Sequence, residues 1–364
     1  MALRPVFGHQ SLRTRLAASF HAGRLPASIL LAGRRGVGKQ RLALWLGQLL
    51  ICERAATERL GEPCGACQSC RYAVRGQHPD LHWFFPLSRP KDGYGSSDDV
   101  KAHLAEATTE RLASDGLWAP SLGTEGLHKD VVKALVERSS LRPAMATVTV
   151  FVVGDAERMV TQEGGDAGAN AFLKLLEEPS RSTTLILTSS EPGALLPTIR
   201  SRVVTVRVPP VARADVEAFL ADPTVARRFA GINMHDAAIR SGGAIGGLFA
   251  NESMTSALAS AKQLLEAAIG PSTPSGTAER IMASARQKVA GARGAFTDTL
   301  DALIVLLHTR VRQLVASGHE ADARRAAIAV IDVEHAKLRA HGNVSPQLLS
   351  DALLVAMHRA MRPG

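Results

Sequence analysis

One stretch limits the possible folds of this chain more than any other: residues 29–40, Ile-Leu-Leu-Ala-Gly-Arg-Arg-Gly-Val-Gly-Lys-Gln. It begins as a short apolar run typical of a buried strand. A loop with glycines at Gly33, Gly36 and Gly38 follows, and then come Lys39 and an amphipathic helix. This arrangement binds phosphate groups, because backbone N–H groups and a helix N-terminus converge on the anion. The stretch therefore predicts a nucleotide-binding phosphate loop.

Two residues depart from the pattern of an active site. A phosphate loop of this kind has Ser or Thr after the lysine, to ligate Mg²⁺, but this chain has Gln40. In P-loop ATPases a strand such as that predicted at 148–153 ends in a Mg²⁺-holding carboxylate. Here Gly154 comes first and Asp155 second. Both departures remove support for Mg²⁺, although Asp155 could equally serve only as a helix cap.

All four cysteines of the chain lie close together in sequence, separated by eleven, two and two residues: Cys52, Cys64, Cys67 and Cys70. Disulfides are not expected in a reducing cytosol. Two-residue spacings let thiolates share one metal ion, and four thiolates complete the tetrahedron of a structural zinc site. The pattern predicts structural Zn²⁺, with an iron–sulfur cluster or a chance grouping of thiols as alternatives.

Predicted strands and helices alternate along the first 208 residues, which favours a doubly wound parallel sheet with its site at the carboxyl ends of the strands. Two short helices are expected within residues 1–28. A polar stretch at 88–127 is interpreted as a surface insertion, partly mobile. Further strands are expected at 81–85, 148–153, 183–188 and 203–208, and helices at 128–142 and 168–178.

No strand is expected after residue 208. We expect a small helical domain over 209–267, a linker rich in Gly, Pro and Ser, and a helical domain over 278–364. The chain has 364 residues, no apolar run of membrane-spanning length and no apolar signal-peptide core, which predicts a cytoplasmic protein of two or three domains. Its net charge of +9 permits contact with nucleic acid without requiring it.

The loop that reads Pro-Thr-Ile-Arg-Ser-Arg-Val at 197–203 carries two arginines. Surface arginines are common, so both could simply be solvated. Alternatively, one is an arginine finger, a planar cation offered to the phosphates of a neighbouring subunit's nucleotide.

These features, in this order, resemble the bacterial replication clamp-loader subunits. The resemblance implies an AAA+ α/β domain over residues 1–208 with a zinc module at 52–70, a small helical lid, and a helical collar that assembles a pentamer. It rests on Gly8-His-Gln, Gly23-Arg-Leu-Pro26, the phosphate loop, the four cysteines, His78-Pro-Asp80, the segment Asn170–Pro179 with its Leu-Glu-Glu-Pro, Ser201-Arg202 and Asn343–Leu349.

The family contains gamma/tau motor subunits that hydrolyse ATP and a delta-prime subunit that does not. Motor subunits keep Gly-Lys-Thr, an acidic pair and an arginine in the small helical domain. The matching positions here look like Lys39-Gln40, Gly154-Asp155 and a glycine-rich loop that ends at Gly247 without an arginine. These losses favour the delta-prime type, with ATP or ADP binding weak or absent and no activity expected of the chain alone. The alternatives are a motor subunit of the same complex and an unrelated P-loop DNA-binding ATPase.

The resemblance also assigns a role to Ser201 and Arg202. They match a Ser-Arg-Cys motif whose arginine completes a neighbour's ATP site in trans, with Val203 in place of the cysteine. The implied partners are gamma/tau motor subunits and a delta subunit in a hetero-pentamer. Within that complex the sliding clamp and primer-template DNA are also implied, and no membrane is.

Overall fold

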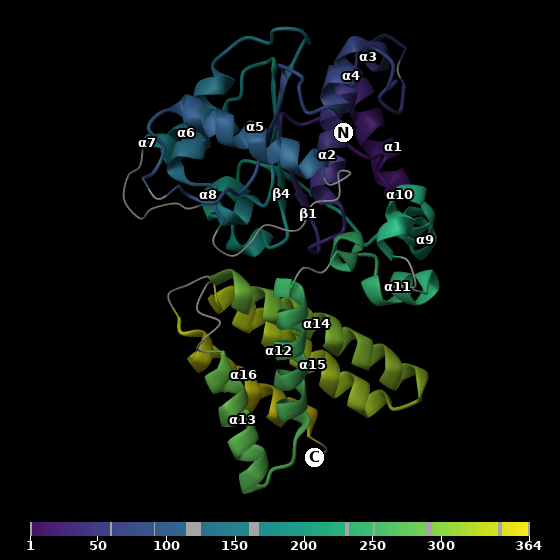
Figure 1. Ribbon diagram of the computed structural model, residues 1–364, viewed down its shortest axis with the longest axis vertical. Coiled ribbons are helices and arrows are strands. Elements are labelled where there is room, and N and C mark those ends of the chain that lie inside the picture. Colours follow the sequence, from purple (N-terminus) through teal and green to yellow (C-terminus); the bar gives the residue numbers. More distant parts are fainter. Residues whose placement is uncertain are drawn as a thin grey trace. The chain divides into compact units, whose positions relative to one another are not determined.

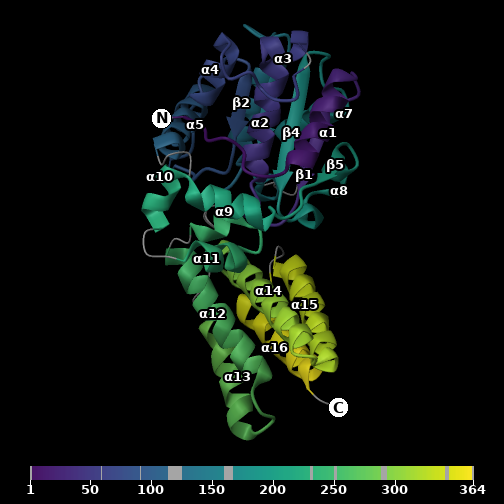
Figure 2. The same ribbon diagram turned by 90° about the vertical axis from the view of Figure 1, so that its right-hand side faces the viewer.

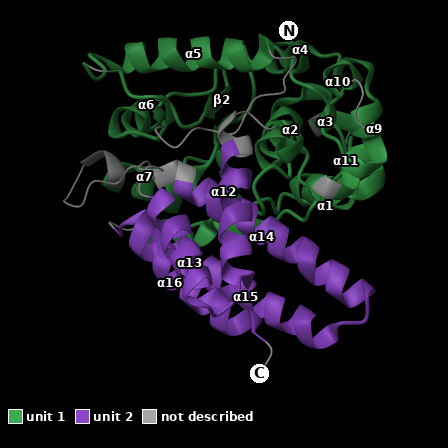
Figure 3. Cartoon of the chain, turned by 60° about the horizontal axis from the view of Figure 1, so that its bottom comes forward, with its two compact units in different colours: residues 1–121, 125–249 green, residues 122–124, 250–364 purple. Residues whose placement is uncertain are grey.

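The computed structural model describes residues 2–58, 60–90, 92–113, 125–159, 167–229, 233–249, 252–287, 293–340 and 344–362. The chain divides into two compact units (Figure 3). The first comprises residues 1–121 and 125–249, and the second comprises residues 122–124 and 250–364. None of the helices in the described ranges is long and apolar enough to cross a membrane.

A five-stranded parallel sheet organises the first unit, as the alternation of strands and helices predicted. Its order is β2-β3-β4-β1-β5, and every pair of neighbours is parallel. β1 lies between β4 and β5 inside the sheet. Because all strands are parallel, the loop that follows β1 lies at the carboxyl edge of the sheet. The strands are β1 (Ser28–Ala32), β2 (Leu81–Phe84), β3 (Thr149–Val153), β4 (Thr183–Ser189) and β5 (Val204–Arg207).

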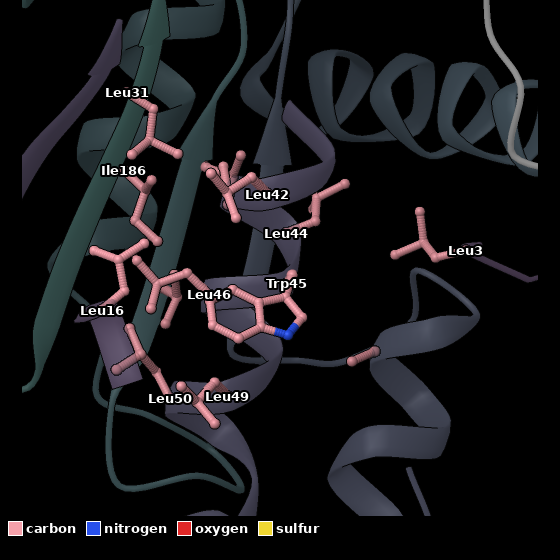
Figure 4. Close-up of a cluster of buried hydrophobic side chains, with 14 of the residues drawn as sticks. Leu3, Leu16, Leu31, Leu42, Leu44, Trp45, Leu46, Leu49, Leu50 and Ile186 are labelled. Carbon is pink, nitrogen blue, oxygen red and sulfur yellow. The ribbon is translucent and has the colours of Figure 1, made fainter. Parts of the chain in front are cut away.

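Both faces of the sheet are covered by helices, which is why its central strands are continuously apolar. Alternate residues of β3 face two different hydrophobic cores. Val150 and Val152 are buried in the first core, and Phe151 and Val153 are buried in the second. The first core is formed with α1 (Gln10–His21), α2 (Lys39–Ile51) and α4 (Gln68–Val74); the second with α6 (Lys129–Ser139) and α7 (Ala167–Glu177). Figure 4 shows the first core, where Leu42, Leu46 and Trp45 of α2 lie beside Leu31 and Ile186 of the sheet.

The N-terminal prediction was wrong in one respect. Two helices were expected within residues 1–28, but the described residues there form only α1. The preceding segment cannot continue a helix, because Gly8 and His9 have left-handed backbone with φ of 73° and 58°. Instead, the backbone N–H of Leu3 donates to the carbonyl oxygen of Val74, 2.7 Å away.

The remaining helices complete the first unit. The segment after β5 forms a small helical extension, residues 211–249, with its own core around Val216, Phe219 and Leu220. Figure 2 shows its three labelled helices. The helices are α3 (Glu53–Glu58), α5 (Ser97–Ala113), α8 (Pro197–Arg200), α9 (Arg213–Ala221), α10 (Pro223–Ala226) and α11 (Met234–Ser241).

The second unit is entirely helical where it is described. The sequence-based division placed residues up to 267 in the small helical domain. In the structure, residues of α12 such as Ala261 and Leu264 are buried in a core shared with α14 and α16. The helices, labelled in Figure 1, are α12 (Glu252–Ile269), α13 (Pro274–Arg286), α14 (Arg293–Ala316), α15 (Glu320–Ala340) and α16 (Pro346–Met361).

Candidate functional site

The predicted phosphate loop connects β1 to α2 at the carboxyl edge of the sheet. Its turn requires glycine, because Gly36 and Gly38 have φ of 82° and 88°. Gly33 is required for a different reason. A Cβ there would lie 2.3 Å from the carbonyl oxygen of Val208. Lys39 is the first residue of α2, so the loop and the helix N-terminus are in the expected relation.

The lysine of this loop is directed back onto its own surroundings. Lys39 is only 5% exposed. Its Nζ donates to the carbonyl oxygens of Gly33 and Arg34, both 2.8 Å away, and to Oγ of Ser190 at 2.9 Å. A phosphate group at this position would have to compete with all three acceptors. Ser190, which directly follows β4, was not among the predicted site residues.

Gln40 is held by contacts on both sides of its amide. Its Nε2 donates to Oδ2 of Asp155 at 3.0 Å, and its Oε1 accepts from Nε1 of Trp83 at 3.3 Å. The amide also lies directly in front of Gly154: a Cβ on that glycine would be 2.7 Å from Gln40 Cδ and Oε1. The glutamine and the glycine are therefore sterically complementary. Where P-loop ATPases keep a carboxylate, this chain packs an amide.

Mg²⁺ does not fit this site. The ion needs near-octahedral oxygen coordination at about 2.0–2.1 Å, commonly with one or two carboxylates from the protein. Here the residue after the lysine has no hydroxyl, residue 154 has no side chain, and the Gln40 amide is committed to Trp83 and Asp155. Asp155 itself has left-handed backbone, with φ of 47°. The structure brings Gln40 and Asp155 together, but as partners of each other.

A buried acid that the sequence reasoning did not assign also lies here. Glu157 Oε1 accepts the N–H of Ser190 at 2.9 Å, while its Oε2 is buried and has no hydrogen-bond partner among the described residues. Burial, reinforced by the charge of Asp155 and opposed by that of Lys39, raises the pKa of Glu157 to about 7. Its position four residues after a strand gave no recognisable signal in sequence.

A cavity of about 180 Å³ adjoins the phosphate loop. One wall is aromatic and apolar, formed by Phe7, Phe219, Ile245 and Phe249. The extension also contacts the loop directly, because the N–H of Gly246 donates to the carbonyl of Gly36 at 2.8 Å. A Cβ on Gly246 would lie 2.8 Å from Gly36 Cα, so this approach depends on glycine. The glycines of this segment thus allow the extension to pack directly on the phosphate loop.

The four cysteines predicted as metal ligands converge within residues 52–70. Their sulfur atoms all lie within 4.8 Å of one another, from Cys52 at the end of α2 to Cys70 in α4. Sγ of Cys52 is 4.0 Å from that of Cys67, and Sγ of Cys64 is 3.9 Å from that of Cys70.

The geometry and chemistry of this cluster fit a tetrahedral zinc ion. Zn–S bonds of about 2.3 Å place the sulfurs of a tetrahedron about 3.8 Å apart. Several sulfurs already accept backbone N–H groups, including Cys52 from Ala55 at 3.3 Å and Cys64 from Cys67 at 3.3 Å. Burial raises the pKa of the Cys52 thiol, so a central cation would be needed to hold it as a thiolate.

Ser201 and Arg202 lie far from the chain's own phosphate loop. Ile29 of β1 pairs with Val204 of β5, so residue 202 precedes β5 at the amino edge of the sheet. The phosphate loop leaves β1 at the opposite edge, so Arg202 and the phosphate site of the same chain are not brought together.

The Arg202 side chain is held on two sides. Its Nε lies 3.2 Å from Oε2 of Glu177, and its Nη1 donates to the carbonyl of Thr198 at 2.9 Å. Its Nη1 also lies 3.4 Å from Oγ of Ser201, which itself donates to Thr198. The Arg202 side chain is 29% exposed. Its orientation is therefore set locally, while part of the group still faces solvent.

His78-Pro-Asp80 has a structural role in this chain. Asp80 is fully buried, and its carboxylate accepts the N–H groups of Ala144, Met145 and Ala146, each at 2.7 Å. Burial alone would raise its pKa, but the three donors outweigh burial and lower the pKa of Asp80. The carboxylate thereby joins the start of β2 to the segment that leads into β3.

Together the parallel sheet, the glycine-rich loop at its carboxyl edge and the buried lysine define a P-loop domain whose metal-binding corner is filled by protein. The family model described as DNA polymerase III, delta subunit, matches residues 8–212, which is more than half of the chain. The chain belongs to this clamp-loader family and is a delta-prime-like protein.

Individual relatives include both branches of that family. The delta-prime subunit of Bacillus subtilis is 28% identical over 212 residues, 58% of this chain and 51% of the relative. That of Pseudomonas aeruginosa is 31% identical over 189 residues, 52% and 45% of the two chains. The gamma/tau subunit of Mycobacterium tuberculosis is 29% identical over 197 residues, 54% and 27%. The chain thus spans about half, or less, of the length of these relatives.

Proposed function

We propose that this chain is a non-hydrolysing subunit of a bacterial replicative clamp loader. In this role it is a rigid wall of a hetero-pentamer with gamma/tau-type motor subunits and a delta subunit. The pentamer would load a sliding clamp onto primer-template DNA. This chain matches only about half, or less, of the length of its relatives. The support for this role is therefore family membership together with the site geometry of the chain itself.

The observation that carries the proposal is the Gln40 amide in front of Gly154. ATP hydrolysis by P-loop enzymes depends on a metal ion that bridges the terminal phosphates. A chain in which that corner is filled by an amide, itself bonded to Asp155 and Trp83, lacks the means to hold the ion. The gamma/tau and delta-prime relatives have similar percentages of sequence identity to this chain. The filled metal corner at Gln40 and Gly154, rather than overall similarity, therefore separates a non-hydrolysing subunit from a motor subunit.

The active contribution proposed for this chain is Arg202. A guanidinium offered to a neighbour's phosphates stabilises the charge that develops in the transition state. The placement of Arg202 at the edge opposite the chain's own loop supports action in trans. Its contacts with Glu177 and Thr198 would hold it ready for that role.

The first experiment reconstitutes the pentamer with motor and delta subunits and measures ATPase stimulated by clamp and primed DNA. Arg202→Ala should lower turnover by well over tenfold while the pentamer still assembles on gel filtration, because a trans arginine contributes about 10³–10⁵ in rate. Arg200→Ala, an exposed arginine two residues earlier, is the matched control and should be neutral. Unchanged turnover with Arg202→Ala excludes the finger role. ATP hydrolysis by the isolated chain would instead identify a motor subunit.

We also propose that the cysteine cluster holds one structural Zn²⁺. Elemental analysis should find one zinc per chain, and Cys64→Ser should lose it and lower the melting temperature, because metal binding contributes to folding. Ser69→Ala, within the same module and bonded to Glu53, should keep the metal. A folded chain with no metal would contradict this assignment, and iron in place of zinc would favour a cluster.

A further inference from the structure

The described residues of the insertion, 88–90, 92–113 and 125–127, belong to the first unit, with the P-loop domain. At its base Leu87 and Gly126 exchange two backbone hydrogen bonds of 3.0 Å, which close the excursion. Its helix α5 buries Val100 and Leu104 in the core beneath α6. Residues 91 and 114–124 lie outside the described residues. The expected polar surface segment therefore includes a helix that is packed as core.

Near the end of α5, Arg111 lies over two aromatic rings of β2 and the residue after it. Its guanidinium carbon is 3.6 Å from the ring centre of Phe85 and 5.1 Å from that of Trp83. The two rings are themselves edge to face at 4.8 Å. A cation over an aromatic face is stabilised more strongly when it is desolvated. The guanidinium therefore lies against Phe85 and within cation–π distance of Trp83.

The contacts continue from this ring into the phosphate site. Trp83 donates its indole N–H to Oε1 of Gln40, and Gln40 donates to Asp155. Arg111 is also within electrostatic reach of the acid: burial lowers the pKa of Arg111 to about 10, and the negative charge of Asp155 opposes that fall. The cation of the insertion and the carboxylate of the site thus lie at the two ends of one continuous set of contacts.

We propose that Arg111 of the insertion is a built-in lock on the degenerate phosphate site, holding Trp83, Gln40 and Asp155 in an arrangement that excludes a divalent cation. The site then keeps one shape whether or not magnesium is present. This inference deepens the proposed function, because it names the element that makes the subunit rigid. It concerns contacts within one chain, so it can be tested without the other subunits.

An isolated surface arginine could not hold the site in this way, since an exposed charge contributes little to stability. Arg111 differs because its charge is partly withdrawn from water and lies against two rings and near Asp155. Removing it would take the charge away from the faces of Phe85 and Trp83 and remove one cation within electrostatic reach of Asp155. The predicted consequence is local: the phosphate loop and the end of β3 should open more often.

The experiment is hydrogen–deuterium exchange of the full chain with Arg111→Met, which keeps an unbranched apolar side chain but removes the charge. Amides of residues 33–40 and 153–157 should exchange at least tenfold faster than in the unmodified chain, while the sheet interior stays protected. Lys101→Ala is the matched control, since it removes an exposed cation from the same helix. It should change neither segment.

A second variant distinguishes an effect passed through Trp83 to Gln40 from simple loosening of α5. Trp83→Phe keeps a ring beneath Arg111 but removes the N–H bonded to Gln40, so exchange should rise in 33–40 and not in 97–113. Faster exchange confined to α5 in Arg111→Met would overturn the lock, as would unchanged exchange in 33–40. Protection of 33–40 by excess MgCl₂, with or without ADP, in the unmodified chain would also overturn it. The exchange of the two variants does not depend on Arg202 or on turnover, so the lock can fail while the proposed function stands.

Discussion

At the scale of single residues, two departures from the P-loop pattern prove to be one steric arrangement. Gln40 and Gly154 lie far apart in sequence, yet the amide of the first occupies the space that a side chain on the second would need. Each change makes the other tolerable. A glutamine at position 40 requires glycine at 154, and the Asp155 carboxylate and the Trp83 indole then satisfy the amide.

This complementarity predicts a non-additive pair of substitutions. Gly154→Asp alone should lower the free energy of unfolding by about 1–3 kcal/mol, because its Cβ would lie 2.7 Å from the Gln40 amide. The double variant Gln40→Thr with Gly154→Asp should recover much of that loss, since threonine vacates the space. Urea denaturation of the two single variants and the double variant measures the coupling. Additive effects would mean that the two residues do not share this space.

At the scale of elements, the strands are held in order by polar groups as well as by the two apolar cores. Asp80 is the clearest case, because one carboxylate satisfies three consecutive backbone N–H groups ahead of β3. Charged acceptors of this kind contribute more than neutral ones. The insertion helix α5 acts at the same scale, since its Arg111 lies over Trp83 of β2 and the Trp83 indole donates to Gln40.

Asp80→Asn should destabilise the chain by about 2–4 kcal/mol at neutral pH, because an amide cannot accept from all three N–H groups. Since the folded-state pKa of Asp80 is lowered, its stabilisation is complete above the unfolded-state value, near 3.8, and is lost as pH falls through the folded-state value. The deficit of the variant should therefore be constant from about pH 5 to 8 and shrink only below about pH 4. A deficit that varies between pH 5 and 8 would assign the effect to another group.

At the scale of the whole molecule, the chain has separate hydrophobic cores in its two units. The sheet cores belong to the first unit, and a helical core that includes Leu303 belongs to the second. Trp45 and Trp83, the tryptophans among the described residues, both lie in the first unit. The P-loop domain and the helical unit thus each have a core of their own.

Leu303→Ala should affect the second unit selectively. The side chain is fully buried, and such truncations cost about 2–5 kcal/mol. Thermal unfolding followed by far-ultraviolet circular dichroism should begin at a lower temperature, whereas the transition followed by tryptophan fluorescence should stay in place. Val315→Ala, at a residue of the same helix that is 58% exposed, is the control. A joint shift of both signals would show that the units unfold as one.

The sequence alone determined whatever depends on local spacing. The alternation of strands and helices predicted the sheet, the glycines before Lys39 predicted the phosphate loop, and the spacing of the cysteines predicted that their sulfurs lie together. Each is a short-range pattern in which neighbouring residues impose the geometry. The same reasoning assigned the polar insertion to the surface, because periodicity does not show which apolar residues of α5 are buried.

Only the tertiary structure decided how distant residues share space. It placed the Gln40 amide against Gly154, brought Arg111 over Trp83 and Phe85, and set Arg202 at the edge opposite the phosphate loop. Glu157 could not be recognised earlier, since its burial depends on Ser190 and Asp155. The physical reason is that steric exclusion, desolvation and ion pairing act between atoms that are close in space, and chain order does not record those distances.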